Sequence, residues 1–226
     1  MGNKTNPIGV RLVVRGHWED AVFARGRDYA EAVYLNHKVK AYLATRYRAC
    51  GMISSAIKQE GNAYVVVINT DDVDAFFASA GQSADEMADA LKLWFWPDAS
   101  LSVRRLDDAA SHPVNIAFKL MDDVATNSTV KASVKQMAKA LVGTSVAGIK
   151  ASYAGRIYGG DIAQTVWHIE GRIPLHTLAA DVRYASVSTK TNYGVCNVKV
   201  WVCANDPSAQ PLEAQEAVQG QAEAEV

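Results

Sequence analysis

Apolar and polar positions in the first half of the chain follow helical spacing first and strand-like spacing afterwards. Apolar side chains near one face of a 3.6-residue period predict a helix over 27–48, ended by Gly51. Two strand-like runs, 52–57 and 63–68, flank Gly61-Asn62, whose turn chemistry predicts a hairpin. A helix and a strand complete this half, at 84–95 and 101–106.

The second half begins with two helical patterns and changes to a period of two after Gly148. The helices are expected over 113–125 and 130–142. Polar or glycine-containing turns separate the strand-like stretches that follow: 149–154, 162–171, 178–187 and 194–203. Two helices followed by a four-stranded antiparallel sheet indicate an α+β fold.

The two ends of the chain lack these patterns. Residues 1–15 mix small polar and basic side chains, so we expect an extended N-terminal arm. From Ala204 the composition turns to Ala, Gln, Glu and Pro, which predicts a disordered acidic tail over 204–226. The elements between the two ends divide into two expected domains, 16–110 and 111–203.

The overall composition is that of an ordinary soluble globular protein, with 49% hydrophobic and 21% charged residues among 226. No uninterrupted apolar run approaches the roughly 18 residues of a membrane span, so no membrane partner is expected. The three cysteines, Cys50, Cys196 and Cys203, have no paired metal-like spacing. They favour structural thiols in a reduced compartment over a metal site.

Charge is distributed in blocks along the chain, although the formal net charge is only -1. Residues 1–50 carry nine Lys and Arg against four Asp and Glu, and residues 121–203 carry nine against five. Residues 51–120 carry five against ten, and residues 204–226 carry none against five. A polyanionic partner is therefore expected at the two basic blocks and not at the acidic middle.

Four segments of the chain resemble the small-subunit ribosomal protein S-three family. The strongest is Gly155-Arg156-Ile157-Tyr158-Gly159-Gly160-Asp161-Ile162-Ala163, where the family usually has a Gly-Arg-Leu-Gly-Gly-Ala-Glu-Ile-Ala-like stretch. Residues 170–181 and 191–202 continue the likeness, and residues 1–12 resemble the opening of the family. These motifs occur in the family's order and span nearly the whole chain before the tail.

The resemblance implies a fold and a place of action. It implies an N-terminal KH domain of the prokaryotic type (type II) and then a C-terminal α+β domain, in agreement with the order of elements above. It also implies binding to small-subunit rRNA in the head of the subunit, beside the channel by which mRNA enters, among neighbouring ribosomal proteins. We expect no enzyme, no catalytic residue, no cofactor and no small-molecule substrate.

The loop by which a KH domain grips nucleic acid is degenerate in this chain. The family usually has a Gly-Lys-Lys-Gly-like loop ahead of an acidic helix, and the matching residues are Gly81, Gln82, Ser83 and Ala84. The second glycine is replaced and both cations are absent, while Asp71, Asp72 and Asp74 lie just upstream. Because cations dominate affinity for the phosphate backbone, we favour a retained scaffold over a working clamp.

Lys131, Lys135 and Lys139 recur at intervals of four residues, which places them on one helix face. Such a row is commonly no more than a solvated face. The family, however, carries an Arg-Arg-x-x-Lys cluster here that faces incoming mRNA, and Lys131, Ala132 and Lys135 take those positions. Both interpretations of Lys131 and Lys135 remain open.

The residues expected to contact rRNA lie in the arm and in the last third of the chain. They are Lys4, Asn6, Pro7, Arg11, Arg156, Arg172 and His176. A guanidinium suits phosphate geometry, and a glycine beside each of Arg156 and Arg172 would let an RNA backbone approach. The alternatives are ordinary strand-end arginines and a structural histidine. Gln164 replaces an arginine that is common in the family.

Three hypotheses of function follow. The first is a structural protein of a divergent ribosome, in a mitochondrion or, alternatively, in the bacterial cytoplasm, because the basicity and the KH loop are weakened. The second is a free KH-type regulatory protein that binds mRNA, which would require a cationic Gly-x-x-Gly loop. The third is a DNA endonuclease or lyase, for which the sequence offers neither a paired carboxylate nor an activated lysine.

Overall fold

The computed structural model describes residues 4–15, 19–61, 63–96, 98–106, 108–125, 129–142, 146–156, 159–191 and 193–204. The chain forms two compact units. One is His17–Asn115, and the other combines Met1–Gly16 with Ile116–Val226. The N-terminal residues thus belong with the second half of the chain, where the sequence had suggested a separate arm.

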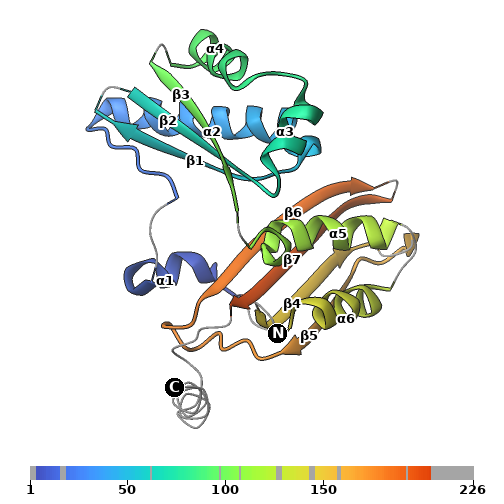
Figure 1. The fold of residues 1–226 in the computed structure, drawn as a ribbon. Coiled ribbons are helices and arrows are strands. Elements are labelled where there is room, and N and C mark those ends of the chain that lie inside the picture. Colours follow the sequence, from blue (N-terminus) through green and yellow to red (C-terminus); the bar gives the residue numbers. More distant parts are fainter. Residues whose placement is uncertain are drawn as a thin grey trace, which may run out of the picture. The chain divides into compact units, whose positions relative to one another are not determined.

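The first unit, His17–Asn115, is a three-stranded sheet covered by helices (Figure 1). Its elements are α2 (Arg27–Tyr47), η1 (Arg48–Cys50), β1 (Met52–Glu60), β2 (Ala63–Thr70), α3 (Val73–Ala80), α4 (Ala84–Trp94), β3 (Ala99–Arg105) and η2 (Ala109–Ser111). The sheet order is β1-β2-β3, with β1 antiparallel and β3 parallel to β2. Val39, Leu43, Phe76 and Leu91 from the helices meet Ile57 in its core.

Helix α3 was not anticipated, although both of its ends carry ordinary signals. Asp72 caps the start by accepting a hydrogen bond from the backbone of Asp74. Gly81 ends it in the left-handed conformation, with φ 62°. Its apolar residues include Phe76, which is fully buried and fixes the helix on the core.

The second unit has a four-stranded antiparallel sheet with helices on one face, as expected from the sequence (Figure 1). Its elements are α1 (Pro7–Arg15), α5 (Pro113–Ala125), α6 (Val130–Leu141), β4 (Val146–Gly155), β5 (Gln164–Gly171), β6 (Val182–Thr191) and β7 (Gly194–Ala204). The strand order is β5-β4-β7-β6. Ile116, Leu120 and Val134 from the helices pack on Ile149 and Val200 of the sheet.

The expectation of an extended arm over residues 1–15 is wrong for Pro7–Arg15, which form helix α1. The side chain of Asn6 accepts a hydrogen bond from the backbone of Ile8, and Pro7 occupies the first helical position. The helix packs near β6 and buries Arg11. The tail expected over 204–226 lies outside the described residues apart from Ala204.

Candidate nucleic-acid interface

Arg11 lies where it cannot contact RNA, contrary to expectation, because its side chain is only 6% exposed. Its guanidinium donates to the carbonyl oxygens of Pro174, Leu175, Thr177 and Ala180 at 3.0–3.3 Å, and to Pro7 at 3.2 Å. These acceptors occupy every edge of the guanidinium fork. Arg11 therefore anchors α1 to the segment between β5 and β6.

The anchored segment carries two residues expected to contact rRNA. Arg172 follows β5 directly and His176 lies a few residues later, and both side chains are exposed. Lys4 and Asn6 are also exposed, whereas Pro7 is buried under the start of α1. Arg11 thus holds α1 and this segment together at one end of the sheet. Four of the seven expected contacts remain accessible there: Lys4, Asn6, Arg172 and His176.

Arg156 lies at the opposite end of the same sheet. Arg172 bonds to Ala147, nine residues along β4 from Arg156, so the backbones of the two arginines are separated by roughly 30 Å at the rise per residue of a strand. The guanidinium of Arg156 donates to the carbonyl of Gly160 at 2.7 Å and of Tyr193 at 3.4 Å, and lies 3.6 Å from the carboxylate of Asp161. The side chain stays 42% exposed, so it shapes its own loop while one edge faces solvent.

The glycines beside the two arginines serve the protein's own packing. A Cβ added at Gly148 would lie 2.5 Å from the backbone nitrogen of Arg172, and one at Gly171 would collide with the carbonyl of Ala147. Gly155 similarly lies against the sulfur of Cys196. Neighbouring backbone and side chains therefore fill the space where a Cβ would lie, and the approach of an RNA backbone over these glycines stays a prediction.

The expected loop over residues 81–84 is engaged in helix capping. Ser83 begins α4 with a capping box: its hydroxyl accepts from the backbone of Glu86, and its backbone donates to the carboxylate of Glu86, both at 3.3 Å. The phenol of Tyr47 donates to the side chain of Gln82 at 3.0 Å, and burial raises the pKa of Tyr47, which keeps it a neutral donor. The backbone N–H of Ser83 is therefore already bonded to the carboxylate of Glu86 and is not available to a phosphate.

Lys131 and Lys135 lie on helix α6, and their side chains are exposed. Ser133, Val134 and Ala138 on the other side of the helix are buried. The sequence spacing therefore predicted the helix and its solvent face correctly. This face and the sheet are on opposite sides of α6, so the lysines form a surface separate from the open face of the sheet.

No site was predicted from the sequence on the face of the sheet away from α5 and α6, hereafter the open face. Ile173, Leu175 and Ala180 cover one end of this face, and the rest is accessible. Lys150 of β4 projects there, with its amine 5.2 Å from the ring centre of Trp201 and 5.6 Å from that of Trp167. Burial and then the charge of Lys4 lower the pKa of Lys150. The alternation of β4, in which Ile149 and Ala151 face the helical core, was a signal that could have identified it.

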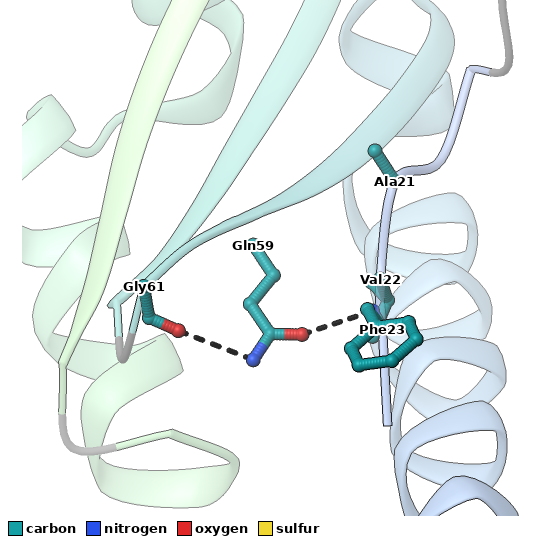
Figure 2. Close-up of a pocket in the computed structure, with 5 residues that line it drawn as sticks. All are labelled: Ala21, Val22, Phe23, Gln59 and Gly61. Atoms are coloured by element: carbon teal, nitrogen blue, oxygen red, sulfur yellow. Dashed lines mark hydrogen bonds between the residues drawn. The ribbon is translucent and has the colours of Figure 1, made fainter. Parts of the chain in front are cut away.

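A shallow pocket in the first unit has no comparable chemistry (Figure 2). It is lined by Ala21, Val22, Phe23, Gln59 and Gly61. The side-chain amide of Gln59 accepts from the backbone of Phe23 at 3.1 Å and donates to the carbonyl of Gly61 at 3.2 Å. These two hydrogen bonds use both the oxygen and the nitrogen of the amide. They hold residues 21–23 beside β1, where Ala21 pairs with Lys58.

The described residues lack both a membrane-spanning helix and a cluster of metal ligands. No helix among them is long and apolar enough to cross a bilayer. They also contain no group of three or more His, Cys, Asp or Glu side chains that could hold a metal ion. None of the three cysteines forms a disulfide, and the thiols of Cys196 and Cys203 are buried while that of Cys50 is partly buried.

Comparison with known proteins identifies the family. The family model described as "Ribosomal protein S3, C-terminal domain" matches residues 116–202. The protein named small ribosomal subunit protein uS3 in Rhodospirillum centenum is 32% identical to this chain, over 96% of this chain and 98% of the relative. The protein of the same name in Rhodospirillum rubrum is 33% identical, over 96% of this chain and 99% of the relative. One from Pelagibacter ubique is 26% identical over 89% of each chain. The chain therefore belongs to the family of the small ribosomal subunit protein uS3.

Proposed function

We propose that the chain is a structural constituent of the small ribosomal subunit that binds small-subunit rRNA through its second unit. The observation that carries the proposal is the near full-length similarity to proteins named for that subunit. The exposed Lys4, Arg172 and His176 at one end of the sheet support it, since small polar and cationic groups suit phosphate contacts. Arg156 offers a second contact at the opposite end.

The first unit is proposed to be a type II KH domain that acts as a scaffold. Its element order and its mixed sheet, with β3 parallel to β2, support the KH assignment. Residues 71–92 carry six carboxylates against one lysine, and the loop at 81–84 is occupied by capping hydrogen bonds. Repulsion of phosphate by this surface supports packing against neighbouring ribosomal proteins over a grip on RNA.

We also propose that Lys131 and Lys135 face mRNA as it enters the subunit. Their exposure on one face of α6 supports this role, because each ammonium group can add a salt-sensitive phosphate contact. A free KH-type regulator is the alternative function, and the uncharged, capped loop does not favour it. For location, the bacterial relatives favour the bacterial cytoplasm over a mitochondrion.

Sedimentation tests the main proposal. Tagged full-length chain expressed in its source cells should migrate with small subunits in a gradient and remain there after a wash in high monovalent salt. Proteins that adhere to the particle non-specifically through charge would dissociate in that wash, because salt screens such contacts. Recovery of the chain at the top of the gradient under both conditions would contradict a ribosomal role and favour the free regulator.

A further inference from the structure

The open face of the C-terminal sheet combines aromatic rings with lysines. Strand register places Lys150 opposite Trp201, and Ser152 between Trp167 and Lys199. On the next strand Tyr184 pairs with Trp201. The cations that project from this face are Lys150, Lys190 and Lys199. The face therefore presents a patch, hereafter the Lys150 patch, made of Lys150, Trp167, Lys199 and Trp201.

Within the patch, the rings hold Lys150 in position. Its ammonium group lies within 6 Å of both indole centres, a separation at which the ring quadrupole attracts a cation. Only 6% of Trp201 is exposed, so its ring contacts Lys150 from one side and offers little surface to a ligand. Trp167 is 44% exposed and leaves part of its ring open to a ligand. Lys150 thus has a fixed place beside an aromatic surface that solvent can reach.

The electrostatics of the patch favour an anion. The four strands contain one carboxylate, Glu170, and it lies 2.7 Å from His168 on the side of β5 that faces the helices. Lys4 is close enough to lower the pKa of Lys150, so two ammonium groups repel each other across this surface. A phosphate between them would relieve that repulsion and would replace water lost around the partly buried amine.

We propose that the Lys150 patch binds a single-stranded segment of RNA, with a base stacked on Trp167 and phosphates held by Lys150 and Lys199. Aromatic platforms interleaved with lysine are suited to unpaired bases, because stacking needs no particular sequence and the cations follow the backbone. Tryptophan alone would also suit a protein interface, but lysine is depleted there, so the two lysines beside the ring favour RNA. The inference rests on the proposed rRNA-binding function and specifies which surface performs it.

Binding of fluorescein-labelled 20-nucleotide single-stranded RNA to the full-length chain tests the proposal. Lys150→Met keeps the aliphatic stem between the rings and removes the charge. It should weaken binding about fivefold and reduce the slope of log affinity against log salt by about 0.7, the value for one phosphate contact on a single strand. Trp167→Leu should weaken binding about fivefold with an unchanged slope, since one base stack is lost.

Matched controls change the same residue types in the first unit. Lys92→Met removes an exposed lysine that pairs with Asp89, and Trp94→Leu removes a tryptophan that is 72% exposed. Both should bind like the wild type. Lys199→Met provides a second patch variant at an exposed position, in case Lys150→Met fails to fold. Wild-type affinity in folded Lys199→Met or Trp167→Leu chain would overturn the proposal.

Photo-crosslinking in assembled small subunits separates this inference from the proposed function. Crosslinks from rRNA to peptides of β4, β5 or β7 would support the patch. Crosslinks of Trp167 only to another protein, in particles that contain the chain, would overturn the patch and leave the ribosomal role intact. Failure of the wild-type chain to enter small subunits would instead refute the ribosomal role, whatever the isolated patch binds.

Discussion

The guanidinium of Arg11 fastens helix α1 to the segment that carries His176. Four carbonyl oxygens of that segment and one within α1 accept hydrogen bonds from this side chain, and the carbonyl of Thr177 also accepts from the backbone of Ala180. Hydrogen bonds to a charged donor contribute more than neutral ones, and buried acceptors left without a partner carry a desolvation cost. Arg11 therefore affects RNA binding at this end of the sheet indirectly, because it positions the exposed residues there.

We expect Arg11→Met to destabilise the second unit by about 2–4 kcal/mol, because several partly buried carbonyl oxygens lose a charged donor. Arg11→Lys should recover only part of this, because an ammonium group lacks the planar fork. Hydrogen exchange of the α1 amides, together with urea unfolding, measures the effect. Lys135→Met, at an exposed position, is the control and should change stability little. If the Arg11→Met and Arg11→Lys chains were as stable as the wild type, the anchoring role would be contradicted.

Glycine substitutions give a second residue-scale prediction. Gly171 has φ 75° and its Cα faces the carbonyl of Ala147, so Gly171→Ala should cost about 2 kcal/mol or more in unfolding free energy. Gly9 lies in α1 with no neighbouring atom within 4 Å of an added Cβ. Gly9→Ala should stabilise the chain by up to about 1 kcal/mol, since alanine favours a helix. Thermal unfolding of both variants compares them directly, and a stable Gly171→Ala would show that the backbone can shift.

At the scale of elements, periodicity predicted most of the fold because its signals are local. Helix α6 and the alternation of β4 could be predicted, since each exposes one face and buries the other. Helix α1 was missed although Asn6 and Pro7 mark its start, because the helix is short and is held by a partner segment more than 160 residues away. Strand β6 begins later than expected, at Val182, because the preceding residues are held by Arg11.

The loop between α3 and α4 gives an element-scale prediction. Ser83→Ala removes the cap of α4 and should destabilise the first unit by about 1 kcal/mol. Binding of the 20-nucleotide RNA should be unchanged, because the loop presents no cation and its acidic surroundings repel phosphate. Denaturant unfolding and RNA titration of the same preparation measure both effects. A loss of RNA affinity without a loss of stability would instead identify a working KH clamp.

The exposed lysines of α6 give a prediction about translation. Changing Lys131 and Lys135 together to alanine should slow reading through a stable mRNA hairpin and leave subunit assembly intact, since both side chains are exposed and pack no core. The measurement is the ratio of product from a hairpin-containing reporter to product from an unstructured one. Lys92→Ala with Lys119→Ala is the control of equal charge. A ratio that matches the control would refute the mRNA-facing role.

At the scale of the whole molecule, the two units differ in the partners that their surfaces are proposed to contact. Charge and motif together singled out Arg172, which is exposed and stays a predicted contact, but Arg11 shows that a basic residue within a motif can serve packing. The Lys150 patch was missed because its members lie on three strands, and only strand register brings them together. The cations proposed to contact RNA therefore lie on the second unit, while residues 71–92 of the first unit carry six carboxylates against one lysine.

This division predicts different neighbours for the two units in an assembled particle. Crosslinking followed by peptide mapping should give rRNA adducts on the second unit and protein adducts on residues 71–98. In that range Leu93 and Trp94 are 81% and 72% exposed beside Asp85 and Asp89. Apolar side chains ringed by carboxylates fit a basic protein surface and repel phosphate. Since charge and exposed apolar area both favour a protein there, rRNA adducts concentrated on the first unit would contradict a scaffold role.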